Sequence, residues 1–341
     1  YNHITLIQPE TLPGHQYFKN RIFDIHSEEE FNHLALELFN FQARENPVYA
    51  HYLQNLGIVA ADVQGVNGIP FLPIRFFKNF SVQTGKFEPE VIFSSSGTSG
   101  SISSKHHVRD SGWYEKTFLK AFERVYGLPA AYCVLALLPS YLEREGSSLI
   151  QMVERLIALS EDQDSGFYLY DHASLAHTIT QKLAKGKKVI LFGVTFALLD
   201  MAENYQENWE SLIVIETGGM KGRRKELLRE EVHSVLKSSF HVDRIHSEYG
   251  MTELLSQAYS GGDGLFECPS WMKVAVREVT DPFAKAPLGK TGGINIIDLA
   301  NVDSCAFIET QDLGRVYSNG RFEVMGRFDN SDIRGCNLMV I

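Results

Sequence analysis

The chain has 341 residues, of which 44% are hydrophobic, so it can bury a large core as one large domain or two modest ones. Its formal net charge is −10 and no cluster of Lys and Arg stands out, which predicts no nucleic acid partner. No apolar stretch reaches the roughly 18 residues that span a bilayer and no signal peptide is visible, so we expect a cytoplasmic protein without a membrane span. The four cysteines lack metal-ligand spacing, which is typical of reduced thiols.

The first elements predicted along the chain are a helix and a short strand. Ser27 and Glu30 form a capping-box pattern, and an amphipathic helix is expected to run from there to about Ala43. Residues 47–80 are aromatic and are interrupted by Gly and Pro. Residues 91–93 then predict a short strand.

A run of small and hydroxylated residues follows this strand: Ser94, Ser95, Ser96, Gly97, Thr98, Ser99 and Gly100. Gly97 and Gly100 let the backbone approach an anion closely, and the hydroxyls and free N–H groups can bind phosphate oxygens. The spacing is not that of a Walker loop. The run therefore predicts a phosphate-binding loop, and a mobile Ser/Gly linker is the alternative.

Apolar strands alternate with helices between about residues 131 and 239. The strands are expected at 131–138, 188–192 and 212–215, and the helices at 147–160, 173–184, 195–203 and 223–239. Short, continuously apolar strands between helices indicate a parallel sheet that is covered on both faces. Ligands of such sheets bind at the carboxyl ends of the strands, where this sequence places Gly, Ser and Pro.

Short β-type segments dominate after about residue 262. They are expected at 274–279, 294–299, 306–310, 315–318 and 322–325, with Gly, Asp and Asn between them. This pattern predicts an antiparallel subdomain. We therefore expect an α/β nucleotide- and acyl-binding region over residues 1–262, and an antiparallel β subdomain with a short C-terminal segment over residues 263–341.

Polar residues next to glycines offer further candidates for a nucleotide site. Thr252 and Glu253 follow a Gly turn, where a hydroxyl can bind phosphate and a carboxylate can bind Mg²⁺, although the same pair also caps helices. Gly218 and Gly219 end a strand, where a flat base could stack on bare backbone. Asp312 follows a strand and could accept both hydroxyls of a ribose.

Each of these features has an ordinary structural alternative when it is taken alone. The segments around Gly218 and Asp312 are also typical of turns, and Arg327 near the chain end could be a surface residue. Their order along the chain is more informative than any one of these features alone.

In that order, the motifs resemble the adenylate-forming superfamily of acyl-CoA synthetases, luciferases and peptide-synthetase adenylation domains. Residues 94–100 resemble its phosphate loop, and residues 249–253 resemble its Tyr-Gly-x-Thr-Glu motif, which includes Tyr249 and Gly250. Residues 310–313 resemble Thr-Gly-Asp-Leu, and residues 326–329 match Gly-Arg-x-Asp.

The resemblance implies an α/β fold, with a large N-terminal domain of parallel sheets covered by helices and a small antiparallel β subdomain. It also implies that the protein binds ATP, with Mg²⁺ on Glu253. Two departures are local: Gln311 stands where the family has Gly, and the usual Pro-Lys after the phosphate loop is missing, with Lys105 nearby instead.

Only residues 330–341 follow the Gly-Arg-x-Asp motif, so the family's mobile C-terminal domain is expected to be largely absent. The LuxE-type acyl-protein synthetases end in this way, and the chain also resembles them at residues 69–78 and 217–222. This resemblance implies that a fatty acid is activated to an acyl-adenylate, passed to Cys336 as a thioester, and handed to an acyl reductase partner. Arg334 could favour the Cys336 thiolate, and a buried, unreactive Cys336 is the alternative.

Two other functions remain open on the sequence. One is a ligase of the phenylacetate-CoA ligase type, which transfers the acyl group to coenzyme A. The other is a non-catalytic nucleotide-binding subunit.

Several other residues have weaker assignments. Lys221 could partly replace the lysine of the missing domain. His106 and His107 are expected to be solvated, or to contact the acyl carboxylate, and His246 to brace a turn. Aromatic and apolar residues within 71–80 and 149–159 could line an acyl tunnel, although most are expected to be core.

Overall fold

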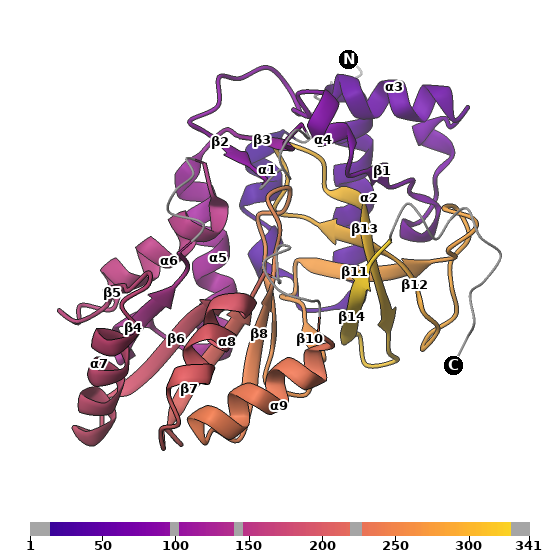
Figure 1. Cartoon of the computed structure of the whole chain (residues 1–341). Helices are drawn as coiled ribbons and strands as arrows, with labels where there is room; N and C mark the ends of the chain where they lie inside the picture. The colour runs from indigo at the N-terminus through magenta and orange to yellow at the C-terminus, as the bar shows by residue number, and fades with distance from the viewer. Residues whose placement is uncertain (1–13, 96–101, 140–145, 219–226, 329–341) are drawn as a thin grey trace, which may run out of the picture.

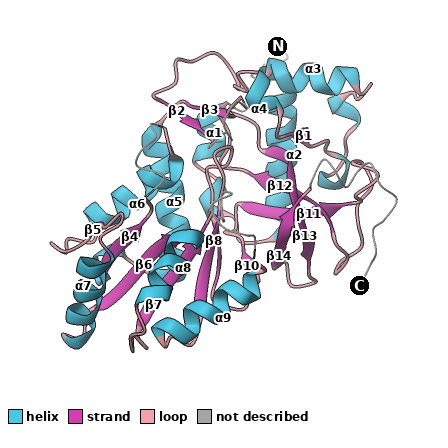
Figure 2. Ribbon diagram, viewed as in Figure 1, coloured by secondary structure: helices cyan, strands magenta, loops and turns pink. Residues whose placement is uncertain are grey.

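A computed structural model describes residues 14–95, 102–139, 146–218 and 227–328 (Figure 1). Most of its strands belong to one large mixed sheet, with helices packed on it, and a separate hairpin lies beside them (Figure 2). The order of strands across the large sheet is β11 (Met272–Arg277), β12 (Gly292–Asp298), β13 (Phe307–Val316), β14 (Phe322–Arg327), β10 (Phe266–Glu267), β9 (Ala258–Ser260), β8 (Ile245–Tyr249), β7 (Leu212–Thr217), β6 (Lys188–Val194), β4 (Tyr132–Leu137) and β5 (Gly166–Phe167), and β1 (Leu72–Pro73) pairs with β13.

Helices connect these strands and cover the sheet. They are α1 (His15–Lys19), α2 (Glu28–Glu45), α3 (Pro47–Asn55), α4 (Phe76–Asn79), α5 (Ser111–Tyr126), α6 (Ser148–Leu159), α7 (His172–Ala184), α8 (Thr195–Asn204) and α9 (Arg229–Phe240). Ser27 caps α2 with the predicted capping box, since its hydroxyl accepts from the Glu30 N–H. Helix α3 was not predicted, although the sequence carries its start signal: the Asn46 side chain caps it and Pro47 occupies its first position.

The predicted parallel part of the sheet is confirmed. Strands β4, β6, β7 and β8 run parallel, and β4 and β6 are buried along nearly their whole length. On β8, Ser247 faces His233 of α9, whereas His246 faces Tyr126 of α5. Because neighbouring residues of a strand point to opposite faces, α9 and α5 cover opposite faces of the sheet.

One helix begins later than the sequence predicted. A helix was expected over residues 223–239, but Leu228 is extended and α9 begins at Arg229. The Glu231 carboxylate accepts from the Leu228 N–H and so fixes the start of the helix at this point. Residues 223–226 lie outside the described part of the chain.

The antiparallel strands continue the same sheet, because β9 pairs with β8 and β14 pairs with β10. The sequence predicted two strands, at 306–310 and 315–318, with Asp312 in a turn between them. That prediction is wrong, since β13 runs without a break from Phe307 to Val316 and pairs with β12 and β14. Its pairing is irregular at two places. The register with β12 shifts between Glu309 and Leu313, and the register with β14 shifts beside Gly314, where an added Cβ would lie 2.2 Å from the Glu323 carbonyl oxygen.

A two-stranded hairpin carries the start of the serine-rich run. Strand β2 (Val91–Ser94) pairs with β3 (Lys105–Val108) in a sheet of its own. Beyond the strands, the Ser95 N–H donates to the Ser104 carbonyl, and the Ser104 N–H donates back to the Ser95 hydroxyl. Two hydrogen bonds therefore hold Ser95 and Ser104 together just beyond the paired strands.

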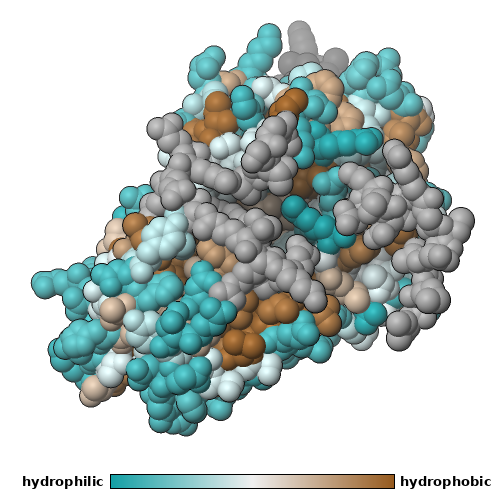
Figure 3. All heavy atoms as spheres, in the orientation of Figure 1, coloured by the Kyte–Doolittle hydropathy of each residue, from teal (hydrophilic) through white to brown (hydrophobic). Residues whose placement is uncertain are grey.

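The surface seen in Figure 3 is mainly hydrophilic, and its hydrophobic residues form small groups. Within the described segments, no helix combines the length and the apolar character that crossing a membrane demands.

Candidate functional site

Two motif segments lie at the carboxyl ends of neighbouring parallel strands. Strand β7 ends at Thr217 and is followed by Gly218, which turns the chain with a φ of +78°. Strand β8 ends at Tyr249 and is followed by Gly250. This edge of the sheet is where an open α/β fold binds ligands.

Tyr249 joins the strand-end motif to the distant C-terminal strands. Its hydroxyl donates to Oδ2 of Asp312 at 2.7 Å, and Arg327 Nε donates to Oδ1 of the same carboxylate at 3.2 Å. Asp312 and Arg327 are direct partners in the β13–β14 ladder. The fold thus brings together three side chains that the sequence had placed in one nucleotide site.

The Asp312 carboxylate keeps the capacity to bind a ligand. Each oxygen of an ionised carboxylate can accept more than one hydrogen bond, so the bonds from Tyr249 and Arg327 leave acceptor sites for two ribose hydroxyls. The Tyr249 pKa is raised well above its usual range, chiefly by burial and further by the Asp312 charge, so the phenol remains a donor at neutral pH. Arg327 is 76% exposed and its guanidinium is open to an anionic ligand.

Thr252 and Glu253 lie in a turn between β8 and β9, so they do not cap a helix. Glu253 is 5% exposed, and burial raises its pKa, while a hydrogen bond with Ser104 and the charge of Arg327 act in the opposite direction. A buried carboxylate of this kind is stabilised by any added positive charge.

Asp298, a residue that sequence reasoning missed, fixes the segment that follows Glu253. Its Oδ2 accepts from the N–H groups of Leu255 and Ser256 at 2.9 and 3.0 Å, and its Oδ1 accepts from the Ser256 hydroxyl. The Trp271 indole N–H donates to that same hydroxyl at 2.9 Å. Nothing in the sequence marks Asp298, because Leu255 and Ser256 lie in a turn about 40 residues earlier in the chain.

His106 connects the hairpin to the Thr252–Glu253 turn. Its Nδ1 lies 2.9 Å from the Thr252 carbonyl oxygen, and the ring is 1% exposed. The expectation of a solvated His106 is therefore wrong, because β3 points this residue into the core against Phe77. Burial lowers the His106 pKa to about 4, so the imidazole is neutral near pH 7 and Nδ1 can donate to the carbonyl. His246 was expected to brace a turn; it lies within β8, and its Nδ1 is 3.1 Å from the Tyr126 hydroxyl of α5.

The donor set around Glu253 fits Mg²⁺ held jointly by protein and phosphates. Among the described residues no three His, Cys, Asp or Glu side chains gather in a form that could hold a metal ion. Mg²⁺ typically takes one or two carboxylates and completes its shell with waters and substrate phosphates. Glu253 could supply the carboxylate, and the phosphates would come from ATP.

Some predicted site residues lie outside the described part of the chain. They are Ser96, Gly97, Thr98, Ser99 and Gly100 of the serine-rich run, Gly219, Lys221 and Cys336. Ser94 and Ser95 are described, at the end of the β2–β3 hairpin.

Comparison with solved structures finds ATP-bound MatB from Rhodopseudomonas palustris, with a TM-score of 0.53 and 14% identity over 71% of this chain and 49% of that chain. It also finds 2-hydroxyisobutyryl-CoA ligase in complex with 2-HIB-AMP and CoA, with a TM-score of 0.65 and 12% identity over 97% of this chain and 75% of that chain. The present chain thus spans about half the length of MatB. No protein-family model and no curated protein sequence matches it. The chain has the mixed α/β fold of the N-terminal domain of adenylate-forming acyl-CoA ligases.

Proposed function

We propose that this protein is a ligase that uses ATP to activate a carboxylic acid as an acyl-adenylate and then transfers the acyl group to a thiol. The observation that carries the proposal is the convergence of Tyr249, Asp312 and Arg327, from three separate motifs, beside the buried Glu253. The fold supports the proposal, because solved structures with this fold bind ATP or an acyl-AMP.

The first half-reaction is a substitution at phosphorus. A carboxylate oxygen of the acid attacks the α-phosphorus of ATP, and the bond to the bridging oxygen breaks, so that pyrophosphate leaves with the electron pair. The protein's task in such a transfer is to position the groups and neutralise charge. Asp312 would hold the ribose, residues 94–100 would hold phosphate oxygens, and Arg327 would face the anionic nucleotide. Mg²⁺ bound at Glu253 would supply further positive charge to the phosphates.

The second half-reaction uses a thiolate, which attacks the acyl carbon of the mixed anhydride and releases AMP. We propose Cys336 as the acceptor, on the resemblance to LuxE-type acyl-protein synthetases. That resemblance implies a fatty acid as substrate and an acyl reductase as the later partner. The three described cysteines are poor nucleophiles, since burial raises their pKa values to about 11 for Cys133 and about 12 for both Cys268 and Cys305.

Coenzyme A is the second candidate acceptor, and it is favoured by the fold that this chain shares with a ligase solved in complex with CoA. Labelled acid and ATP distinguish the two acceptors. An acyl-protein that hydroxylamine cleaves, and that is lost in Cys336→Ser, supports Cys336. Consumption of coenzyme A without labelled protein supports the CoA ligase.

Exchange of labelled pyrophosphate into ATP tests the first half-reaction. We expect exchange that depends on added acid, and loss of that exchange in a folded Glu253→Gln protein, because the amide cannot replace the carboxylate's charge. The exposed Glu154→Gln variant serves as the matched control. ATP binding without exchange for any acid would instead indicate a non-catalytic nucleotide-binding subunit.

A further inference from the structure

A second polar cluster lies beside the candidate nucleotide site, on the face of the sheet that α5 covers. Glu248 of β8 is the direct ladder partner of Tyr259 of β9, so their side chains lie on the same face. His246, two residues before Glu248, shares that face and contacts Tyr126 of α5. The nucleotide-binding assignment uses none of these side chains.

Glu248 is a carboxyl side chain that is less buried than the tyrosines of this cluster. Tyr114 and Tyr259 are 1% and 3% exposed, whereas Glu248 is only half-buried. Burial raises the Glu248 pKa to about 7, the Thr217 hydroxyl bond lowers it, and the Glu216 charge raises it further. No Lys or Arg among the described residues contributes to this shift, and His246, with a pKa lowered to about 4 by burial, is neutral.

Two groups in the cluster lack partners within the described part of the chain. The Tyr259 hydroxyl is fully buried and has no hydrogen-bond partner there. Glu248 accepts from the Thr217 hydroxyl through Oε2, and no described residue donates to its Oε1. A buried hydroxyl without a partner is unfavourable, because it has lost its hydrogen bonds to water. A ligand with its own hydrogen-bonding group would remove that cost.

The cluster is continuous with the candidate site. Glu248 immediately precedes Tyr249, and Thr217 immediately precedes Gly218, both at the carboxyl ends of parallel strands. An added Cβ on Gly250 would lie 2.4 Å from Glu248 Oε1, so this oxygen is packed directly against the turn of the Tyr-Gly-Met-Thr-Glu motif. An acid whose carboxylate reaches the nucleotide at this turn would have its remaining atoms close to Glu248.

We propose that Glu248, Thr217 and Tyr259 bind a hydrogen-bond-donating group, a hydroxyl or an ammonium, on the acid substrate. The protein would then activate a short polar acid in preference to an unsubstituted fatty acid, the substrate that the sequence resemblance implies. This inference rests on the proposed adenylation activity. It is chemically reasonable because a carboxyl without a cationic partner recognises donors and is poorly matched to an alkyl chain.

Acid-dependent pyrophosphate exchange tests the inference with hydroxybutyrates and aminobutyrates, using butyrate and palmitate as references. We expect wild-type kcat/KM to be about tenfold or more higher for at least one substituted acid than for butyrate, the gain typical of a buried hydrogen bond to a charged group. Preference for the amino acids over the hydroxy acids would identify an ammonium, and the reverse preference a hydroxyl.

Glu248→Gln and Tyr259→Phe should each reduce that preference, mainly through KM of the acid, while Glu154→Gln should leave it unchanged. Two variants are used because either could impair folding, which thermal melting would reveal. Exchange with palmitate but with no polar acid overturns the inference and leaves the adenylation proposal standing. Equal losses with every acid would mean that the cluster is structural and would also overturn it. Absence of exchange with every acid overturns both proposals.

Discussion

At the scale of single residues, Asp312 offers the most direct test of the nucleotide site. We expect Asp312→Ala to raise KM for ATP by about tenfold or more and to change kcat much less, because a ribose contact is made equally in the ground and transition states. Steady-state pyrophosphate exchange measures both constants. Asp281→Ala, which removes an exposed carboxylate that accepts from the Phe283 N–H of its own loop, is the control. An unchanged KM with a collapsed kcat would contradict the ribose assignment.

Because His106 is buried, we expect the stability of the protein to depend on pH. Its pKa is lowered from 6.5 to about 4 by burial, so between these values the unfolded chain binds a proton that the folded protein does not. The free energy of unfolding should therefore fall as the pH drops from about 6.5 to 4. Urea denaturation at several pH values should show a shallower fall in His106→Asn.

The control for this pH effect is His51→Asn, which removes an exposed histidine of α3. An identical slope in wild type and His106→Asn would show that His106 is protonated in the folded state at mildly acid pH.

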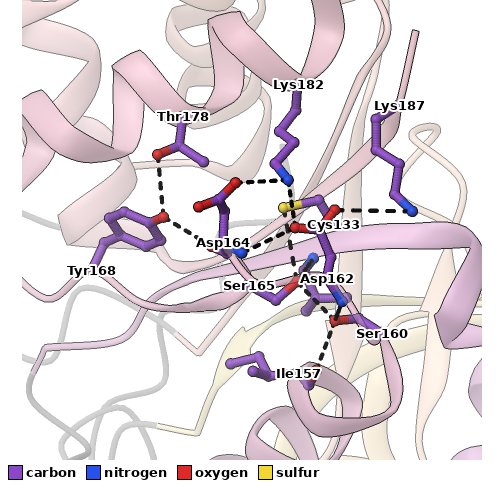
Figure 4. Close-up of polar contacts among 11 residues, drawn as sticks. Cys133, Ile157, Ser160, Asp162, Asp164, Ser165, Tyr168, Thr178, Lys182 and Lys187 are labelled. Atoms are coloured by element: carbon purple, nitrogen blue, oxygen red, sulfur yellow. Dashed lines mark hydrogen bonds and ion pairs between the residues drawn. The ribbon is translucent and has the colours of Figure 1, made fainter. Parts of the chain in front are cut away.

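At the scale of elements, a buried ion pair ties α7 to the edge of the parallel sheet (Figure 4). Lys182 Nζ lies 2.5 Å from Asp162 Oδ1, and the neighbouring Ser165 hydroxyl accepts from the Val134 N–H of β4. Asp162 is 8% exposed, and burial alone would raise its pKa, but the bonds from Lys182 and the Asp164 N–H lower it overall.

We expect Lys182→Met to lower the free energy of unfolding by about 1–3 kcal/mol, because it leaves a buried carboxylate without its main donor. KM for ATP should not change, since the nucleotide-site residues lie on β8, β13 and β14. The control is Lys187→Met. The Lys187 side chain is 36% exposed and its Nζ lies 3.9 Å from Asp162, so its loss should lower the free energy of unfolding by less than about 0.5 kcal/mol.

The Lys182–Asp162 ion pair should also make the free energy of unfolding depend on pH. Because the folded-state pKa of Asp162 is lowered, its stabilisation is present at neutral pH and is lost as acid protonates the carboxylate. The stability gap between wild type and Lys182→Met should narrow in acid. A gap that stays constant down to pH 3 would mean that the ion pair contributes little.

The sequence predicted correctly those helices and strands that are marked by a pattern within the element itself. The alternation of apolar strands and helices predicted β4, β6, β7 and their helices, because buried parallel strands are apolar along their whole length. The resemblance of the motifs to the adenylate-forming superfamily placed Tyr249, Asp312 and Arg327 in one site, and the fold brings these side chains together. The predicted turn at Asp312 was wrong, because the strand is completed by hydrogen bonds to β12 and β14, which only the three-dimensional fold supplies.

Asp298 and His106 illustrate what a single sequence leaves undetermined. Asp298 matters because four donors of the chain converge on it, from Leu255, Ser256 and Ala300. His106 is buried because β3 turns it inward, while its neighbour His107 stays partly exposed. Burial and long-range hydrogen bonds are properties of the fold, so residue type and local spacing do not predict them.

At the scale of the whole molecule, contacts cross the boundary that the sequence predicted at residue 262. The Trp113 indole N–H on α5 donates to the Ala300 carbonyl at 2.9 Å. Phe23 lies between two tryptophans, with ring centroids 5.1 Å from Trp113 and 4.7 Å from Trp271. Strand pairing between β9 and β10 carries the sheet across the same boundary. These contacts predict that the two regions unfold together.

Single-tryptophan variants test this prediction, because the chain has only three tryptophans, Trp113, Trp209 and Trp271. One variant keeps Trp113 and the other keeps Trp271, with Phe at the remaining positions. We expect their fluorescence transitions in urea to share one midpoint and one slope, because coincident probes are the mark of a single cooperative unit. The far-ultraviolet circular dichroism of each variant checks that the substitutions leave its secondary structure intact. A transition at a lower urea concentration for Trp271 than for Trp113 would show that residues 263–341 unfold as a separate domain. The contacts of Phe23 and Ala300 would then not couple the two regions.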